Sequence, residues 1–592
     1  MIRMNNSKNI RNTDAYIVLC VLLCAITAYF YLSGNYILVF QETRSLFLFS
    51  GDYLHKFLLK PGGLLEYSAK FLTQFYTDSF SGPLVISVIL SIPAVTLYFI
   101  NNRLIPGISY SLVFLLIPSF LLLLMQANYY HMMEYNLGFL MVLGYYLFMI
   151  SSEKKYHNIL ILVLFPVFYY LTGAYAIIFS ALYIIHNLIH KEGKQKFINS
   201  AILIILGLIS FIIGWKLLFL QTIEQLVLYP FPAFADPSYK IIFFILAGYI
   251  IFYPLISVVT SRLRKSNLNK KTYSYITIAV AFIFTTIILF KIYNPQTARV
   301  IELERLVFAE KWKEAIELQE KKPSRNLIGQ YFYNIALSET DQLCERLFFG
   351  SQDFAAGTLV LPWGDDHLDR GAYFYYSIGL INEAHRWAYE EMVVYGNRPQ
   401  NIKLLARTSI INGDYEMAGK YLNILKKTIY YRGWAKKYEA MIDHPELIKS
   451  DPDLGTKTAL LPKTNFFIQF NEPQNNIPLI LEGQPDNRKA IDYYMAGLLL
   501  TKQVEIIVNN VKSLKPSGFD HIPRHIEEAV LIYYNSTKTL PDLGGLIINP
   551  ATQDRFNQYF SAYVNERKNP ATLKENMQKQ FGNTFWFYFH FK

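Results

Sequence analysis

The chain has 592 residues, of which 52% are hydrophobic, and its formal net charge is +11. Much of the positive charge lies in short loops between apolar segments, where it indicates membrane topology and contact with a membrane surface, so nucleic acid is excluded as a partner. Of the three cysteines, only Cys344 lies outside the first apolar segment, which excludes a disulfide framework in the second half.

Apolar segments dominate the first half of the chain. A membrane span needs about 20 apolar residues, and we expect about nine spans here. They lie near 15–33, 83–101, 107–127, 132–151, 158–172, 174–190, 198–219, 240–260 and 273–292. The composition changes near Tyr293. We therefore predict an all-α protein, with a polytopic membrane domain over 1–292 and an exported helical domain over 293–592.

Every second loop between these segments is basic, which is typical of the cytoplasmic side of a membrane protein. The basic residues are Arg3, Lys8, Arg11, Arg103, Lys154, Lys155, Lys191, Lys194, Lys196, Arg262, Arg264, Lys265, Lys270 and Lys271. With an odd number of spans, the N-terminus is cytoplasmic and everything after residue 293 lies outside. The first apolar stretch is long for a signal peptide and no small-x-small cleavage site follows, so we expect a retained signal anchor.

The first outer loop, residues 34–81, carries two amphipathic segments. The second segment follows Pro61-Gly62-Gly63, a helix start signal, and pairs Glu66 with Lys70 at i,i+4 opposite its apolar face. A preceding piece around Leu54–Leu58 has similar spacing. Amphipathic helices of this kind lie in the plane of the membrane interface.

Ionisable side chains gather on the predicted outer side, where they are candidate site residues because charge at membrane depth is costly. In the first outer loop they are Glu42, Arg44, Asp52, His55, Lys56, Lys60 and Asp78, and His131 and Glu134 follow around the third and fourth spans. At the edge of a span, long charged side chains reach water at little cost in free energy. Each of these residues, taken alone, is therefore also explained by a structural role without any part in a site. Their convergence on one face favours a site.

In the second half, two segments around Ala384 and Ala418 resemble each other at a spacing of 34 residues, which is the tetratricopeptide period. We therefore expect a tetratricopeptide-like solenoid, clearest over 366–425, with a concave binding surface. Residues 446–485 are rich in Pro, Gly and Asn and are expected to interrupt it as a loop. No phosphate-binding glycine loop, zinc spacing or nucleophile elbow is present, so we expect no metal site and no cofactor. The acidic segment Trp363–Arg370 favours a helix N-cap over a metal site.

Several runs of residues resemble an uncharacterised family of Bacteroidota multi-pass membrane proteins. They are Gln41-Glu42-Thr43-Arg44, Gly51-Asp52-Tyr53-Leu54, Lys60-Pro61-Gly62-Gly63-Leu64, Phe71-Leu72-Thr73-Gln74-Phe75-Tyr76, Tyr169-Tyr170-Leu171-Thr172-Gly173 and Asn412-Gly413-Asp414-Tyr415. The resemblance covers nearly the whole chain and implies a Gram-negative inner membrane.

The architecture also resembles, more remotely, C-type (GT-C) glycosyltransferases, which use polyprenyl-phosphate-linked sugar donors. This resemblance implies glycosyl transfer on the periplasmic face, with the lipid bilayer and a lipid-linked sugar as partners. The reaction needs a carboxylate base for an acceptor hydroxyl, for which Glu42 is the first candidate and Asp52 the second. It also needs groups that bind the substrate and its phosphate: Arg44, His55, Lys56, His131 and Glu134.

Two other functions stay open. A non-catalytic membrane-anchored scaffold for envelope assembly would bind a protein or peptide on the repeats, and Glu42 with Arg44 would then be an ordinary interfacial ion pair. A transporter is the third alternative, although the last three spans carry no charged residue at mid-depth.

Overall fold

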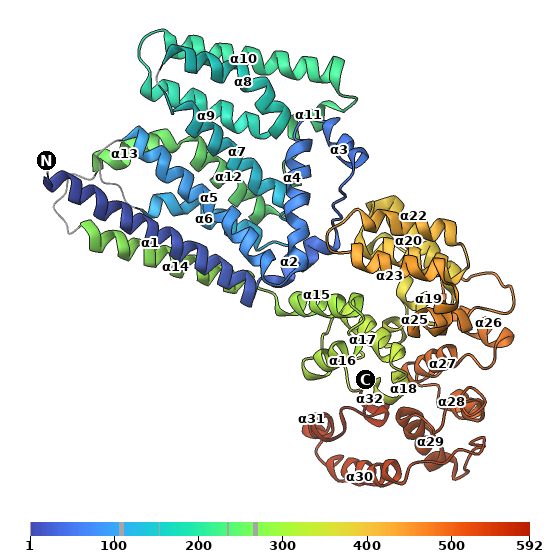
Figure 1. Cartoon of the computed structure of the whole chain (residues 1–592). Coiled ribbons are helices and arrows are strands. Elements are labelled where there is room, and N and C mark those ends of the chain that lie inside the picture. The colour runs from blue at the N-terminus through green and yellow to red at the C-terminus, as the bar shows by residue number, and fades with distance from the viewer. Residues whose placement is uncertain (1, 106–111, 153, 234–235, 264–269) are drawn as a thin grey trace. The chain divides into compact units, whose positions relative to one another are not determined.

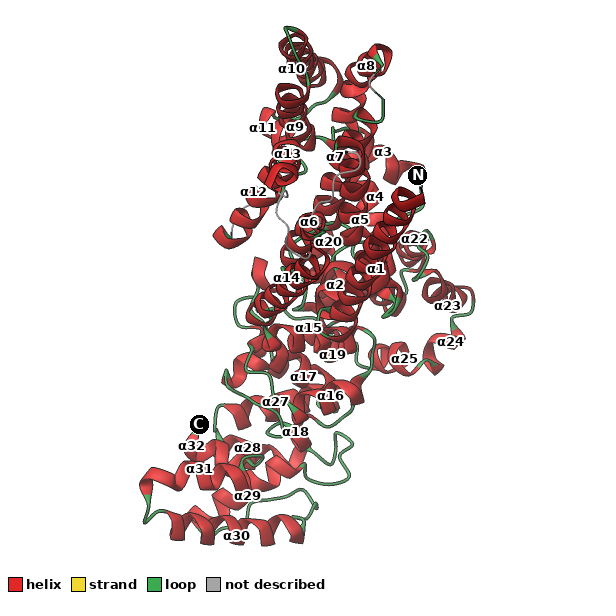
Figure 2. Ribbon diagram, turned by 90° about the vertical axis from the view of Figure 1, so that its left-hand side faces the viewer, coloured by secondary structure: helices red, strands yellow, loops and turns green. Residues whose placement is uncertain are grey.

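The computed structural model describes residues 2–105, 112–152, 154–233, 236–263 and 270–592 (Figure 1). Every regular element in these ranges is a helix, and none of these residues forms a strand (Figure 2). The all-α fold is therefore confirmed for this part of the chain. The chain divides into two compact units, Met1–Tyr293 and Asn294–Lys592, which are described in turn.

The first unit has helices at all the expected apolar segments, and further helices between them. They are α1 (Ile2–Leu32), α2 (Asn35–Thr43), α3 (Gly51–Leu58), α4 (Gly63–Thr73), α5 (Ser81–Leu104), α6 (Val113–Gln126), α7 (Met133–Met149), α8 (Lys155–Thr172), α9 (Tyr175–His190), α10 (Gln195–Ile213), α11 (Ile223–Leu228), α12 (Pro237–Ile251), α13 (Tyr253–Leu263) and α14 (Lys270–Ile292). The first residues of the expected third span, and the basic residues Arg264 and Lys265, lie outside the described residues.

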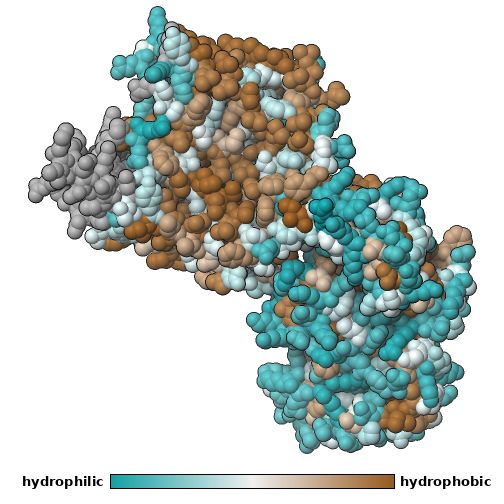
Figure 3. Space-filling view, in the orientation of Figure 1, coloured by the Kyte–Doolittle hydropathy of each residue, from teal (hydrophilic) through white to brown (hydrophobic). Residues whose placement is uncertain are grey.

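Four helical stretches among the described residues are long and apolar enough to cross a membrane: Thr13–Leu32, Ser81–Leu104, Gln195–Leu218 and Ser274–Ile292. Apolar residues also cover much of the surface of this unit in Figure 3, and side chains such as Leu208 and Phe290 are exposed. Exposed apolar surface on this scale is typical of a protein that contacts lipid or another protein. The first unit thus has the composition and surface of a membrane protein.

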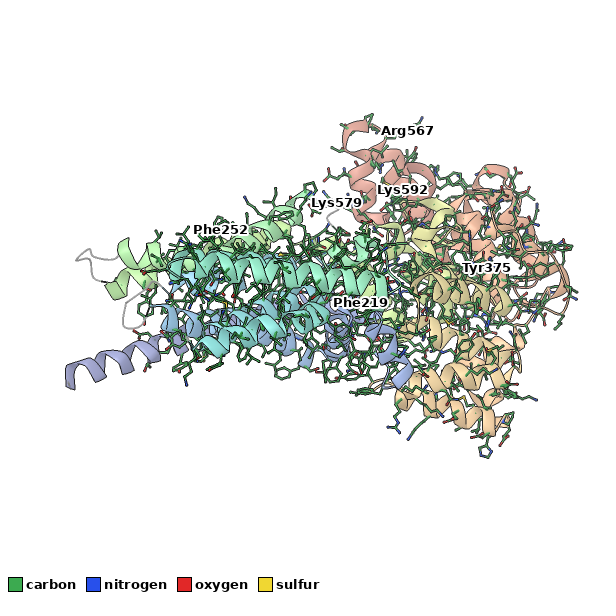
Figure 4. All side chains as sticks on the ribbon, turned by 90° about the horizontal axis from the view of Figure 1, so that it is seen from above. Phe219, Phe252, Tyr375, Arg567, Lys579 and Lys592 are labelled. Carbon is green, nitrogen blue, oxygen red and sulfur yellow. The ribbon has the colours of Figure 1, made fainter. Side chains whose placement is uncertain are left out.

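The expected span over 240–260 is a pair of helices, α12 and α13, with a bend of 65° between them. The break falls at Phe252, which is labelled in Figure 4. Pro254 follows in the first turn of α13, and it has no N–H to continue the α-helical hydrogen bonds of α12. If the pair is counted as one span, the number of long apolar spans rises to five.

The first outer loop is helical over most of its length. The two expected amphipathic helices are α3 and α4, and the Glu66–Lys70 pair is confirmed with a separation of 3.6 Å. The structure adds α2, which the sequence pattern did not indicate, and a 3₁₀ turn at Gln74–Thr77. Gly62 precedes α4 at φ +77°, a backbone conformation that favours glycine.

The second unit consists of shorter helices. They are α15 (Pro295–Phe308), α16 (Trp312–Lys321), α17 (Leu327–Glu339), α18 (Leu343–Arg346), α19 (Ala372–Ser377), α20 (Ile381–Tyr395), α21 (Pro399–Ile411), α22 (Tyr415–Lys426), α23 (Arg432–Asp443), α24 (Glu446–Ser450), α25 (Pro452–Ala459), α26 (Asn476–Gly483), α27 (Arg488–Leu500), α28 (Val504–Asn510), α29 (Arg524–Thr537), α30 (Pro550–Glu566), α31 (Pro570–Phe581) and α32 (Phe585–Phe591).

Each helix from α19 to α23 packs against the next one in the chain. Ala384 on α20 and Ala418 on α22 are both fully buried, so two small residues lie where neighbouring helices approach closely. The expectation of a loop over 446–485 is wrong at its two ends, where α24, α25 and α26 lie, and it holds in the middle, where no α-helix forms between α25 and α26. Asp451 caps α25: its side chain accepts hydrogen bonds from the backbone N–H groups of Asp453 and Leu454. This polar residue therefore starts a helix instead of marking a loop.

Candidate functional site

Glu42 and Arg44 lie at the C-terminal end of α2. The Glu42 side chain is buried, and its Oε1 accepts a hydrogen bond from Thr77 Oγ1 at 3.2 Å. The Arg44 guanidinium lies over the Phe40 ring, 4.3 Å from its centroid. Glu42 therefore faces the interior of the first unit, held between α2 and the 3₁₀ turn at 74–77.

Asp52, His55 and Lys56 lie on the exposed side of α3. Ser50 caps this helix by accepting a hydrogen bond from Tyr53 N at 3.3 Å, while Phe57 on the other side is buried. The three side chains thus share one face, as expected for positions i, i+3 and i+4 of a helix. That face is exposed, whereas Glu42 points into the protein.

His131 lies within a buried polar network. Its Nδ1 is 2.5 Å from the Tyr239 hydroxyl and its Nε2 is 2.9 Å from Asn136 Oδ1. Asn136 Nδ2 donates to Gln126 Oε1 at 2.7 Å, and Gln41 Nε2 donates to the His131 carbonyl at 2.8 Å. Both ring nitrogens of His131 therefore have hydrogen-bond partners. Through His131 and Asn136, the network connects side chains of α2, α6, α7 and α12.

Two of the sequence runs named above meet in space, although they are more than 100 residues apart. Gly62 N donates to the Tyr170 carbonyl at 2.8 Å, and Ala174 N donates to the Tyr229 carbonyl at 2.9 Å. A Cβ on Gly173 would lie 2.3 Å from the Tyr229 carbonyl oxygen, which is closer than van der Waals contact allows. The first outer loop, the α8–α9 turn and the segment before α12 therefore form one junction.

A charged cluster fills this junction. Lys60 Nζ donates to Glu66 Oε2 at 2.8 Å, Lys70 Nζ lies 3.6 Å from Glu66 Oε1, and the Tyr229 hydroxyl donates to Glu66 Oε2. Lys60 Nζ also lies 4.0 Å from the centroid of the Tyr229 ring. Burial alone would raise the pKa of Glu66, but Lys70 and Lys60 together hold the pKa below its ordinary value. Glu66 is thus a carboxylate with three donors around it.

Glu134 belongs to the same neighbourhood. It lies in the first turn of α7, and α4 packs against α7. Burial raises the pKa of Tyr229, and the negative charges of Glu66 and Glu134 raise it further. Of the candidates from the sequence, Glu134 is therefore the one that the structure brings to Glu66 and the two lysines.

An apolar cavity of about 320 Å³ lies between α1, α6 and α14. Ala25, Ile26, Phe120, Leu123 and Leu289 contribute apolar walls. At one end the lining includes Ser33, two residues before the start of α2. The cavity has the size of small-ligand pockets and the apolar character that suits a hydrocarbon chain.

Sequence reasoning did not pair Lys60 or Tyr229 with Glu66. Glu66 and Lys70 are recognisable from their i,i+4 spacing, but Tyr229 is 163 positions away from Glu66. No local pattern links two residues at that separation, because only tertiary packing brings them together.

The expected helix N-cap in the acidic segment at 363–370 is wrong. The cap of α19 is Gly371, which has no side chain to accept a hydrogen bond. Asp369 instead pairs with Arg370 at 2.8 Å and with Arg398 at 3.7 Å, so the segment supplies a buried ion-pair network. Within the part of the chain that the structure describes, no three His, Cys, Asp or Glu side chains are placed to hold a metal ion.

The helices and these contacts define an all-α protein with several helices able to cross a membrane and a charged cluster joining the loops between them. The chain belongs to a family described as "Family of unknown function (DUF6057)", whose model matches residues 10–592. No curated protein and no solved structure matches the chain.

Proposed function

We propose that the chain is a GT-C-like membrane glycosyltransferase that acts on a polyprenyl-phosphate-linked sugar at the periplasmic face of a bacterial inner membrane. About nine helices cross the bilayer with the N-terminus in the cytoplasm, as the charge of the loops indicates. The second unit lies in the periplasm and is a tetratricopeptide-like solenoid. The observation that carries the proposal is the apolar cavity beside the start of α2, the helix that carries the buried Glu42.

The cavity supports a lipid-linked donor. A polyprenyl chain is a long hydrocarbon, and the walls of the cavity come from apolar helices of the first unit. Tyr29, Ser33 and Tyr293 line it beside these apolar residues and supply polar groups for a lipid head group. The helix α2 starts two residues after Ser33 and carries Glu42 near its C-terminal end, so one short helix links the cavity to the proposed base.

Glu42 is the proposed base. In the reaction, the bond between the sugar C1 and the phosphate oxygen breaks, and a bond between C1 and the acceptor oxygen forms. The acceptor proton passes to the Glu42 carboxylate, and the polyprenyl phosphate leaves as an anion. Arg44 is the proposed phosphate partner because a guanidinium binds phosphate through two parallel hydrogen bonds. Asp52 is the second candidate base, and His55, Lys56, His131 and Glu134 are the other proposed substrate contacts. For His131, contact with the substrate requires that one of its two ring hydrogen bonds, to Tyr239 or to Asn136, is exchanged.

The test is an assay of polyprenyl phosphate release in membranes supplied with a labelled polyprenyl-phosphate sugar. Glu42→Gln should abolish release at normal protein abundance, since it removes the base and keeps the shape. Arg44→Ala should raise the KM for the donor. The matched control is Glu224→Gln on α11, which changes an exposed carboxylate and should leave release unchanged. Full activity of the double variant Glu42→Gln, Asp52→Asn would contradict the proposal.

A second candidate function is a membrane-anchored scaffold that binds an envelope protein or peptide. It is favoured by the stacking of α19 to α23 in chain order, which is typical of repeat proteins with extended binding surfaces. In that case Glu42→Gln should have no effect in a complemented deletion strain. Substitutions on the concave face of the repeats should then be the damaging ones.

A further inference from the structure

The turn between α22 and α23 (Figure 1) concentrates positive charge at the surface of the second unit. Residues 426–437 contain no Asp or Glu. Their basic residues are Lys426, Lys427, Arg432, Lys436 and Lys437. We call this stretch the basic turn. No candidate residue considered so far lies in it.

Two of these five side chains are neutralised by carboxylates of the same unit. Lys426 Nζ pairs with Glu439 Oε1, and Lys437 Nζ lies 3.3 Å from Asp451 Oδ2. The other three are exposed, and no carboxylate in the described parts of the chain forms an ion pair with them: Lys427, Arg432 and Lys436. The last two are four positions apart in α23 and therefore share one face of that helix. The basic turn thus presents accessible positive charge that the second unit does not balance.

The backbone of the basic turn is held by hydrogen bonds and ring contacts. Thr428 Oγ1 donates to the Leu425 carbonyl at 2.7 Å and accepts from Tyr431 N at 3.1 Å. The Trp434 ring stacks on the Tyr438 ring, with 4.1 Å between their centroids. Because the turn is already ordered, little conformational entropy is lost when its exposed side chains bind a partner.

Two uncharged side chains are exposed at the tip of the basic turn. Ile429 is 50% exposed and Tyr430 is 36% exposed, and both lie between Lys427 and Arg432 in the chain. Segments that bind a membrane surface combine apolar and aromatic side chains, which enter the boundary between head groups and acyl chains, with Lys and Arg, which stay with anionic head groups. Tyrosine is enriched at that depth. The tip therefore favours a bilayer over a soluble acidic partner, which would match the charge alone.

The chain itself brings the second unit to a bilayer. Ser274–Ile292 is one of the long apolar stretches able to cross a membrane, and it forms most of α14. Only Tyr293 and Asn294 separate the end of α14 from the start of α15 at Pro295. So short a linker keeps the second unit at the membrane surface, and contact with lipid head groups becomes an intramolecular step at high effective concentration. A surface of modest affinity is then enough for docking.

We propose that the basic turn docks onto the head-group layer of a bilayer that contains anionic phospholipids, with Ile429 and Tyr430 inserted at the boundary of the acyl chains. Near an anionic membrane surface, each Lys or Arg strengthens binding about fivefold. Lys427, Arg432 and Lys436 together therefore strengthen docking about 100-fold. Salt screens this attraction, so docking weakens as the ionic strength rises. The inference rests on the membrane character of the first unit and not on glycosyl transfer.

The test places a nitroxide at the tip of the basic turn in the full-length protein, reconstituted in lipid nanodiscs. The label is attached to Ile429→Cys in a background of Cys20→Ala and Cys24→Ala, while Cys344 is buried and stays unlabelled. Power-saturation electron paramagnetic resonance compares the collisions of the label with oxygen, which is concentrated in lipid, and with a water-soluble nickel chelate. Discs of phosphatidylcholine alone are compared with discs that also contain phosphatidylglycerol. We expect the label to enter lipid in the anionic discs and to stay in water in the neutral ones.

The control label is attached to Phe467→Cys. This position is 93% exposed and lies in a stretch without Lys or Arg, residues 464–487. It tests whether exposure of an apolar side chain is by itself enough for contact with lipid. The control label should stay in water in both kinds of disc.

Two triple variants then separate the basic turn from charge elsewhere in the second unit. The first replaces the three unpaired basic residues of the turn: Lys427→Gln, Arg432→Gln and Lys436→Gln. It should lower the docking constant about 100-fold and return the label at 429 to water. The matched control removes one exposed arginine, labelled in Figure 4, and two exposed lysines from α31 and the turn before it: Arg567→Gln, Lys568→Gln and Lys574→Gln. It should leave the label in lipid.

Loss of lipid contact in the first triple variant alone supports the proposal. The proposal is overturned if the label at 429 stays in water in anionic discs, if it enters neutral discs equally, if the first triple variant keeps it in lipid, or if the matched control releases it as well. Lipid contact of the label at Phe467→Cys also overturns it. A melting curve of each protein shows whether the fold is intact. If the labelled Ile429→Cys does not fold, a label at Tyr430→Cys carries the comparison.

Discussion

Gly173→Ala tests the junction between the outer loops most directly. Gly173 has φ +59° and ψ −128°, a backbone conformation that is open in practice only to glycine. Holding an alanine there costs about 1–3 kcal/mol. Its Cβ would also lie 2.3 Å from the Tyr229 carbonyl oxygen, which accepts the hydrogen bond from Ala174 N at 2.9 Å. Pushing that oxygen away costs about 0.5–1.5 kcal/mol more. We therefore expect a total loss of about 1.5–4.5 kcal/mol in the free energy of unfolding.

The matched control is Gly193→Ala. Gly193 also has a positive φ, +65°, but no atom lies within 4 Å of the position of its Cβ. It should therefore show only the cost of backbone strain. Both variants are compared with the wild type by thermal melting in one detergent at one scan rate, because the apparent Tm of irreversible unfolding depends on that rate. If Gly173→Ala melts no lower than Gly193→Ala, the contact between Gly173 and Tyr229 does not hold the loops together.

Three other predictions concern both units. Since Lys70 and Lys60 hold the folded pKa of Glu66 below its ordinary value of 4.5, this carboxylate stabilises the fold above that pH and ceases to as pH falls through the folded pKa. The difference in Tm between the wild type and Glu66→Gln should therefore become smaller as the pH of the melting experiment is lowered. A Tm difference that does not change with pH would contradict this. Ala384→Leu and Ala418→Leu should each destabilise the second unit by about 1–3 kcal/mol in denaturant titrations, while Gly419→Ala, with open space at its Cβ, should be neutral or stabilising. Alkaline phosphatase fused after Lys592 should be active, and a fluorescent cytoplasmic reporter at the same position should stay dark.

The long helices of the first unit could be predicted because their signal is local. A run of apolar residues forms a helix in lipid wherever it occurs, since every backbone polar group must be bonded within the segment. The tight turn ending at Gly173 and the pair of Glu66 with Lys70 are equally local. The bend at Phe252 was not predicted, because the apolar run continues through Pro254 while the hydrogen-bond ladder does not.

The candidate site was harder to predict than the helices. Glu42, Asp52 and His55 lie close together in the chain, but the structure turns Glu42 inward and leaves the other two exposed. Whether a side chain of a short amphipathic helix faces protein or solvent depends on what packs against that helix. The composition of the first outer loop contains no information about its partners, which come from segments far along the chain.

The sequence alone thus predicted the features that depend on neighbouring residues. These are the spacing of apolar residues in helices, the breaks at Gly and Pro, and the change of composition near Tyr293, where the first unit ends. Contacts between residues far apart in the chain could not be predicted in this way, since the energy of an ion pair or hydrogen bond depends on distance in space and not on distance along the sequence. The partners of Glu66 and the network around His131 arise only when distant helices pack, because packing alone brings these groups within a few ångströms and removes the water between them.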